Sequence, residues 1–401
     1  SDKPRTKYRN LITQSGGDIS DYPVNALETV FYPTNKIRLP VNKENVIKSG
    51  VVKEKDRNKI VDFIDIDLPE SILTKNQIMM LDIVANNEWE RPIYFTGGSY
   101  EDSEYIWMKD YLQLDGLVYK LVPIKTSIDA NPYEMGRIDS DLMYNIVKEW
   151  SWGNSNSNKI YHDPETRKNS ISFRSNLSRL SEVLIDEDKY EQAEEIIDLA
   201  FSKMPIDYYG YYSLWTPFVK GYYEINRDDK AQEIVKKLSF KYSDRLNYYS
   251  SLEIFNQYNV GEEIISDIER FRNLIETIKA SGEKDILSEQ IKSFISGSEK
   301  FNYIYGEYDF YISLSDFIIS LVELNQLEYS RSILDKIEEQ LIRRVSVFSN
   351  IDQDEQVYYI EGITSDINQY SRLISQIEIY DVELHNDYDK NLKEMLSKMV
   401  E

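Results

Sequence analysis

Short apolar or alternating runs, which are typical of strands, are confined to the first third of the chain. These runs are KIRLPV at 36–41, IVDFIDIDL at 60–68, PIYF at 92–95 and LVYKLVPI at 117–124. Pro40 predicts an edge position for the first run. Apolar residues recur at helical spacing between the second and third runs, at Ile78, Leu81, Val84 and Ala85. They predict a helix with Thr74 as its N-cap.

Residues 91–125 carry the clearest succession of elements. The pattern predicts a strand, a Gly97-Gly98 turn, a helix from Ser99 to Tyr111 and a last strand. Phosphate-binding loops lie at such strand-to-helix turns, but neither GxGxxG nor GxxxxGK is present. Acidic side chains also occupy the first helical turn, where they would repel a phosphate. We therefore interpret the glycines as a tight turn.

From Asp139 onward the periodicity is helical, interrupted by the linker-like GNSNSN at 153–158. One helix pair has the spacing of a tetratricopeptide repeat, at Leu177, Leu180, Leu184, Tyr190, Ala193, Ile197, Ala200 and Pro205. A second copy falls on Trp215, Phe218, Tyr222, Ala231, Val235 and Leu238, and a weaker third on Leu314, Phe317, Leu321, Leu327, Ser330, Leu334 and Ile337. Stacked pairs of this kind form one cooperative body.

The predicted fold class is therefore α+β overall. Residues 1–35 form an irregular lead-in, and residues 36–128 form a small α/β module with parallel neighbouring strands and right-handed crossovers. Residues 139–401 form a large all-α, tetratricopeptide-like helical-repeat domain.

Composition narrows the possible functions. The formal charge of −23 argues against nucleic-acid binding, which needs a surplus of Lys and Arg. The chain has no Cys and two His, which excludes disulfides and thiol catalysis and disfavours a metal site or a Ser-His-Asp triad. No apolar run has the length of a membrane helix. We expect no cofactor and no bound metal. The chain begins without Met, as expected of a piece of a longer protein.

Two carboxylates on one predicted strand are the first candidates for catalysis. Asp65 and Asp67 share a strand face, so their side chains lie ~6.5–7 Å apart, a spacing compatible with an acid/base pair or a hard-metal site. The alternative is a solvated strand end before Pro69. His162, in the sequence His162-Asp163-Pro164, is interpreted as polar surface before a helix that begins at the Asp-Pro pair.

An aromatic run is the predicted binding site. Its members are Tyr208, Tyr209, Tyr211, Tyr212, Trp215 and Tyr222. Helical-repeat arrays bind extended peptides on their concave face, and Tyr and Trp provide broad contacts at low entropic cost; aromatic faces also stack on sugars. The alternative is that part of the run packs between helices, because Trp215 and Tyr222 occupy core positions of the repeat.

Two segments carry a family resemblance. MLDIVANNEWERPIYFTGG at 80–98 and WMKDYLQLDGLVYKLVPIK at 107–125 resemble the C-terminal soluble region of large Bacteroidota membrane proteins. Their N-terminal membrane domain resembles the protein O-mannosyltransferases, glycosyltransferases of the GT-C type. The resemblance is specific over 36–125. It implies that the catalytic acidic residues lie in the membrane domain, which this chain lacks, so no catalytic residue is transferred to it.

The resulting prediction is a non-catalytic, extracytoplasmic domain, tethered in the periplasm through that membrane domain. Its expected partners are an acceptor protein or peptide, a glycan or an assembly partner, together with the membrane domain itself. Two alternatives stay open. One is a carbohydrate-active enzyme that uses Asp65 and Asp67; the other is a purely structural cap.

Overall fold

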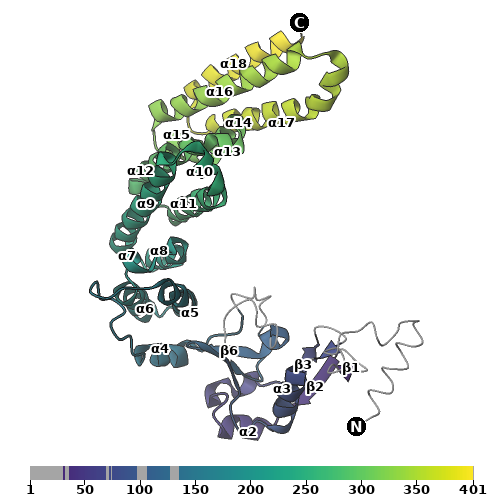
Figure 1. Cartoon of the computed structure of the whole chain (residues 1–401), viewed down its shortest axis with the longest axis vertical. Helices are drawn as coiled ribbons and strands as arrows, with labels where there is room; N and C mark the ends of the chain where they lie inside the picture. Colours follow the sequence, from purple (N-terminus) through teal and green to yellow (C-terminus); the bar gives the residue numbers. More distant parts are fainter. Residues whose placement is uncertain are drawn as a thin grey trace, which may run out of the picture. The chain divides into compact units, whose positions relative to one another are not determined.

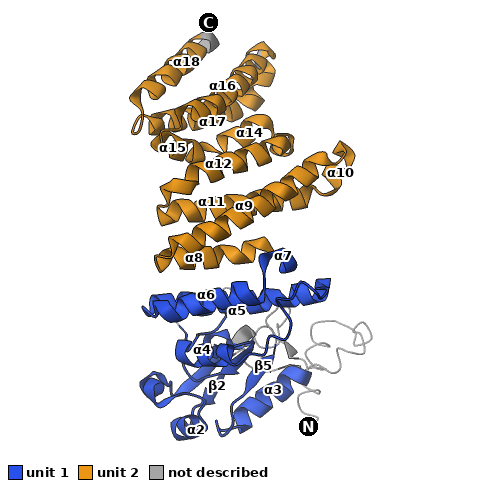
Figure 2. Cartoon of the chain, turned by 90° about the vertical axis from the view of Figure 1, so that its left-hand side faces the viewer, with its two compact units in different colours: residues 1–210 blue, residues 211–401 orange. Residues whose placement is uncertain are grey.

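The computed structural model describes residues 30–31, 36–68, 72–73, 75–96, 106–126 and 135–400. The chain divides into two compact units, residues 1–210 and 211–401 (Figure 2). Among the described residues, strands occur only up to residue 121. All described residues after 139 are helical or irregular. The predicted combination of a small α/β module with an all-α region is confirmed. The predicted domain boundary between 128 and 139 stays a prediction.

The strands form three small sheets, of orders β1-β4, β2-β3 and β5-β7-β6. Their bounds are β1 Val30–Phe31, β2 Lys36–Pro40, β3 Phe63–Asp67, β4 Ile72–Leu73, β5 Tyr94–Thr96, β6 Leu112–Asp115 and β7 Val118–Leu121. All paired strands of the described residues are antiparallel. The prediction of parallel neighbours is therefore wrong. In the sheet β5-β7-β6 the cause is β6, which sequence reasoning did not assign to a strand: β6 pairs with β7 as a hairpin, closed by Gly116 with a φ of +72°.

The helices of the first unit follow and separate these strands (Figure 1). They are α2 Lys43–Lys48, the 3-10 helix η3 Glu54–Lys59, α3 Lys75–Asn86, the 3-10 helix η4 Ile106–Tyr111, α4 Ser140–Lys148, α5 Pro164–Asp186, α6 Tyr190–Lys203 and α7 Ile206–Tyr209. Helix α5 begins as predicted, because the Asp163 carboxylate caps it by accepting the Thr166 N–H at 2.8 Å.

The sheet β5-β7-β6 has two chemically different faces. Its apolar face carries Leu112, Leu114, Tyr119 and Leu121, all buried. Leu112 pairs with Leu121 and Leu114 with Tyr119, so these side chains point to one side. The opposite face is polar and lines the pocket described below.

The second unit is entirely helical in its described part (Figure 2). Its elements are η6 Tyr212–Trp215, α8 Thr216–Glu224, α9 Asp228–Ser251, α10 Ile254–Asn259, α11 Gly261–Ser281, α12 Lys284–Ser298, η7 Glu299–Phe301, α13 Asn302–Tyr305, α14 Glu307–Ile312, α15 Ser315–Glu323, α16 Leu327–Asn350, α17 Gln353–Ile377 and α18 Val382–Val400.

The three predicted repeat copies coincide with the helix pairs α5–α6, α8–α9 and α15–α16. Each pair is joined by the same turn, in which one non-glycine residue is left-handed: Asp188, Asn226 and Asn325, with φ of +58°, +58° and +56°. The residue after it donates its N–H to a carbonyl five positions back at 2.8 Å in all three turns. This is the Schellman arrangement. The third copy, weaker in sequence, is therefore equivalent in backbone geometry.

A continuous series of aromatic rings runs through the core of the second unit. Tyr242 of α9 stacks on Phe271 of α11, with ring centroids 5.4 Å apart. Phe271 meets the edge of Phe294 of α12 at 5.6 Å, and Phe294 meets Phe317 of α15 at 5.4 Å. These four buried rings connect the four helices α9, α11, α12 and α15.

Candidate functional site

The first unit encloses a polar pocket of about 190 Å³. Its walls come from residues 50–56, from the three strands β5, β6 and β7, and from the first turns of α4. These segments are far apart in the sequence. The pocket therefore exists only once the module has folded.

A row of polar side chains runs from the mouth of the pocket across its floor. Tyr94 of β5 lies opposite Lys120 of β7, Lys120 lies opposite Gln113 of β6, and Gln113 forms a bridge with Arg137. Residues directly opposite one another point to the same face of a sheet, so all four side chains share the polar face. Gln113 and Lys120 are buried, which is unusual for residues of this chemistry in a sheet.

Hydrogen bonds join these side chains into one network. The Lys120 ammonium lies 2.9 Å from Asp115 Oδ2, and each side chain is only 5% exposed. Gln113 Nε2 donates to Asp115 Oδ1 at 2.8 Å, and Arg137 Nη1 donates to Gln113 Oε1 at 3.2 Å. A buried network with each member bonded is rigid, so it holds the floor of the pocket in a defined geometry.

Two further carboxylates complete the wall. Asp56 Oδ2 accepts from Arg137 Nη2 at 3.3 Å, and Asp56 Oδ1 lies 2.7 Å from the Lys59 ammonium. Burial pushes the pKa of Asp56 upward, but the hydrogen bond from Lys59 and the charge of Arg137 outweigh it, so its pKa lies below the ordinary value. Asp56 therefore stays ionised at neutral pH.

The second of these carboxylates also positions α4. Asp139 is the N-cap of α4, because its Oδ1 accepts the Leu142 N–H at 3.2 Å. The Lys53 ammonium lies 3.8 Å from Asp139 Oδ2, and the Lys55 ammonium lies 3.3 Å from Oδ1. Asp139 thus joins the 50–56 segment to the helix on the other side of the pocket.

The mouth of the pocket carries an aromatic ring. Tyr94 is 48% exposed, unlike the buried side chains of the floor. Partial burial and the negative charge of Asp115 raise the pKa of its hydroxyl. The hydroxyl therefore stays protonated at neutral pH and can donate a hydrogen bond.

The predicted carboxylate pair lies outside this pocket, on the two-stranded sheet β2-β3. Asp65 is held by Arg38 at 2.6 Å, and Asp67 lies 3.5 Å from Lys36, with side chains 59% and 77% exposed. The hydrogen bond from Arg38 lowers the pKa of Asp65. A general acid in glycoside hydrolysis needs the opposite shift. The geometry shows cross-strand ion pairs, and a catalytic role for the pair stays a prediction.

The predicted aromatic site is divided between the two units, with Tyr208 and Tyr209 in the first. Tyr208 stacks on the His162 ring at 5.6 Å, and the Tyr209 hydroxyl donates to the Ser155 carbonyl at 2.8 Å. His162 is buried, so its interpretation as polar surface is wrong. Its ring packs between this tyrosine pair and the 153–158 loop, where Nε2 lies 3.1 Å from the Ser157 carbonyl.

The remaining members of the run lie in the second unit. Trp215 and Tyr222 are buried, in agreement with their core positions in the repeat, whereas Tyr211 is exposed. Tyr212 is half-buried and meets the edge of the Tyr242 ring at 5.9 Å. A binding role for the run stays a prediction. The Gly97-Gly98 turn and the start of the helix after it lie outside the described residues.

Two features escaped sequence reasoning. The pocket residues Gln113, Asp115 and Lys120 alternate with apolar residues, a strand signal that predicts one polar face. The second feature is the surface around α10, which we call the α10 surface. It comprises Ile254, Phe255, Tyr258 and Tyr303, each between 39% and 74% exposed. Its signal is the short, strongly apolar LEIFNQY stretch at 252–258.

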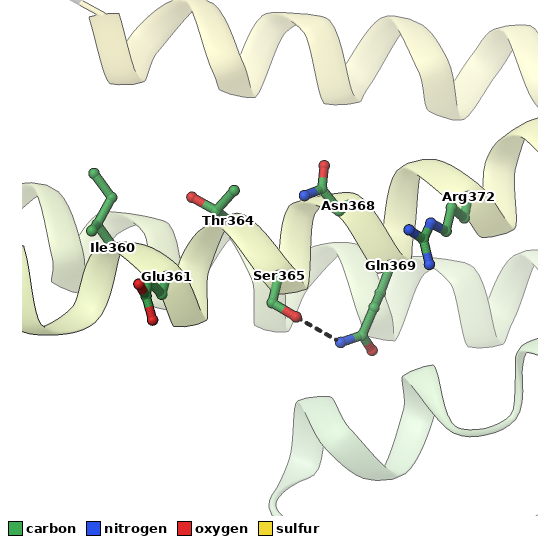
Figure 3. A pocket seen from close by; sticks show the side chains of 7 residues that line it. All are labelled: Ile360, Glu361, Thr364, Ser365, Asn368, Gln369 and Arg372. Carbon is green, nitrogen blue, oxygen red and sulfur yellow. Dashed lines mark hydrogen bonds between the residues drawn. The ribbon is translucent and has the colours of Figure 1, made fainter.

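A larger hollow of about 620 Å³ lies along α17 (Figure 3). The side chains that line it all come from this one helix: Ile360, Glu361, Thr364, Ser365, Asn368, Gln369 and Arg372. All are exposed, and within the group Gln369 Nε2 donates to Ser365 Oγ at 3.1 Å. The hollow is an open surface without a buried polar group, so the smaller pocket of the first unit is the better-built site.

The fold and the pocket define a mixed α/β module with a polar interior site, combined with helical pairs. Residues 1–142 match the family model of TMEM260-associated domain 2. All residues that line the polar pocket lie within this match except Ile146. Comparison with curated proteins and with solved structures gave no match. None of the described helices is long and apolar enough to cross a membrane.

Proposed function

We propose that this chain is a non-catalytic, extracytoplasmic part of a TMEM260-like membrane protein, and that it binds a protein partner through the α10 surface. The match of residues 1–142 supports the TMEM260-like setting. The resemblance of residues 36–125 to the soluble region of GT-C type membrane proteins supports a parent glycosyltransferase whose catalytic residues lie elsewhere. In that setting the partner is an acceptor protein or a component of the same assembly.

The α10 surface is the observation that carries the proposal. Ile254, Phe255 and Tyr258 project from one short helix and are each at least 67% exposed. The ring of Tyr303 meets that of Tyr258 at 5.9 Å, and its hydroxyl donates to Gln257 at 2.6 Å, so the surface is held in place. Clustered aromatic and aliphatic side chains of this kind mark protein interfaces, because covering them removes apolar area from water.

The charges beside this surface specify the partner further. Glu253 directly precedes α10, and Glu262 and Glu263 follow it at the start of α11, all exposed. The whole chain is strongly acidic as well. A complementary partner segment therefore combines apolar side chains with Lys or Arg.

A peptide array tests this proposal with the intact chain. Peptides that combine aromatic and basic residues should bind the wild type, and Phe255→Ser with Tyr258→Ser should abolish that binding. The matched control is Val357→Ser with Tyr358→Ser, which removes two equally exposed apolar side chains from α17. Binding that survives the α10 changes, or no peptide binding at all, would contradict the proposal.

A further inference from the structure

We propose that the polar pocket of the first unit binds a neutral, hydroxyl-rich ring, the size of a single sugar residue. The proposal is independent of the α10 surface, because it concerns another unit and another chemistry. Its basis is the charge balance, size and lining of the pocket.

The charges that line the pocket cancel. Three cationic side chains, Lys53, Lys120 and Arg137, face three carboxylates, Asp56, Asp115 and Asp139. Each cation already has a carboxylate partner, at 3.8 Å for Lys53–Asp139, 2.9 Å for Lys120–Asp115 and 3.3 Å for Arg137–Asp56. An anionic ligand would lie against these carboxylates and a cationic ligand against these cations. Either would also have to compete with the Lys120–Asp115 pair, which is buried on both sides, at a cost in free energy.

A hydroxyl group avoids this cost. It donates one hydrogen bond and accepts others, so it can bridge a carboxylate oxygen and an ammonium or guanidinium N–H without separating them. The Lys120 ammonium carries three N–H groups and Arg137 five, more than their partners in the floor consume. Several hydroxyls on one ring match the alternation of donors and acceptors along the floor.

The volume of the pocket and the tyrosine at its mouth limit which hydroxyl-bearing molecules can bind. About 190 Å³ lies below the range of roughly 300–1,000 Å³ that drug-sized ligands need. It is nevertheless far more than the ~30 Å³ share of one water. One ring therefore enters and a longer chain stays outside. The half-exposed ring of Tyr94 supplies an apolar face at the mouth, against which the C–H side of such a ring can pack.

Isothermal titration calorimetry on the intact chain tests the inference. The probes are methyl glycosides of mannose, glucose, galactose and N-acetylglucosamine, with inorganic phosphate, acetate and Ca²⁺ as charged comparisons. We expect at least one glycoside to bind, with an affinity at least tenfold weaker in Tyr94→Leu and in Gln113→Leu. Tyr358→Leu, which removes an exposed tyrosine in the second unit, should bind as the wild type does.

The thermal unfolding of each variant separates binding from folding. Tyr94 is half-exposed, so Tyr94→Leu should keep its melting temperature while it loses the ligand, which a purely structural role would not produce. The inference is overturned if no glycoside binds at millimolar concentration, or if only phosphate, acetate or Ca²⁺ does. It is equally overturned if both pocket variants bind the glycoside as the wild type does.

Discussion

Arg179 Nη2 donates to the backbone carbonyl of Gly136 at 2.9 Å, and it reaches the Met135 carbonyl at 3.1 Å. The bond joins α5 to the segment that leads into Arg137 and Asp139 of the pocket. Nearby, Asn176 Nδ2 of the same helix donates to the Gly116 carbonyl in the β6–β7 turn at 2.8 Å. Helix α5, the first helix of the first repeat-like pair, thus holds both the β6–β7 turn and the segment before Arg137.

Arg179→Met should therefore destabilise the first unit. The substitution keeps much of the apolar stem but leaves two buried carbonyls without their donor, which costs about 2–3 kcal/mol of unfolding free energy. Urea unfolding measures the change. Lys168→Met, at an exposed position of the same helix, should change the value by no more than about 0.5 kcal/mol. Equal effects of the two substitutions would show that the hydrogen bonds to the two carbonyls do not contribute to the unfolding free energy.

Asp141 should make stability depend on pH in the acid range. Hydrogen bonds from Lys189 and Lys55, at 2.6 and 2.8 Å, lower its pKa from 3.8 to about 2. Because the folded-state pKa is the lower one, the contribution is complete above about pH 4 and is lost as pH falls toward 2. The group is half-exposed, so we expect about 1 kcal/mol or less.

Unfolding free energies of the wild type and Asp141→Asn between pH 2 and 6 check this. The difference between the two curves should be largest at pH 5–6 and should shrink toward pH 2. Other lowered carboxyls, such as Asp56, affect both proteins alike and cancel in the difference. A difference that stays constant over this range would contradict the assignment.

The left-handed turn residues give a third test. Asn325 is exposed and has a φ of +56° between α15 and α16. Asn325→Ala should lower the unfolding free energy by about 1 kcal/mol, because Ala lacks the short polar side chain whose local hydrogen bonds let Asn tolerate the left-handed conformation. Asn325→Gly should be neutral to within about 0.5 kcal/mol. Asn226 occupies the same place in the α8–α9 turn, and the same two changes there should give the same order of stabilities.

The aromatic series predicts that two phenylalanines of the second unit contribute very differently to stability. Phe294 is fully buried and touches Phe271 and Phe317, so Phe294→Ala should cost about 3–5 kcal/mol. Phe255 is 74% exposed on the α10 surface, and Phe255→Ala should change stability by no more than about 0.5 kcal/mol. A large cost at Phe255 would mean that the α10 surface supports the fold and is not free for a partner.

Local spacing was enough to predict the helical pairs. Leu177, Ala193 and Ala200 belong to helices that pair with their immediate neighbours in sequence, so the repeat pattern contains most of the necessary information. The strand pairing was mispredicted because Leu112–Asp115 was not assigned to a strand. The two-residue Gly116-Leu117 loop, with Gly at its first position, is a typical hairpin connection and shows the antiparallel return.

The pocket could not be predicted in the same way. Asp56, Tyr94, Lys120 and Arg137 each look like ordinary solvated residues within their own segments, and only the folded sheet places them together. The carboxylates Asp65 and Asp67, by contrast, look like a pair in sequence but are each neutralised by a residue of β2. In this module, therefore, closeness in sequence did not predict which polar side chains form a site.

The strict alternation along β6 ties the pocket to the core. Leu112 and Leu114 face the interior, whereas Gln113 and Asp115 face the pocket. A slip of one residue in the pairing with β7 would exchange the two sets, placing carboxylate and amide in the core and leucines on the pocket floor. An insertion or deletion in the Gly116 turn would therefore remove binding site and sheet together. Lineages that lengthen or shorten this turn should lose the pocket residues as well.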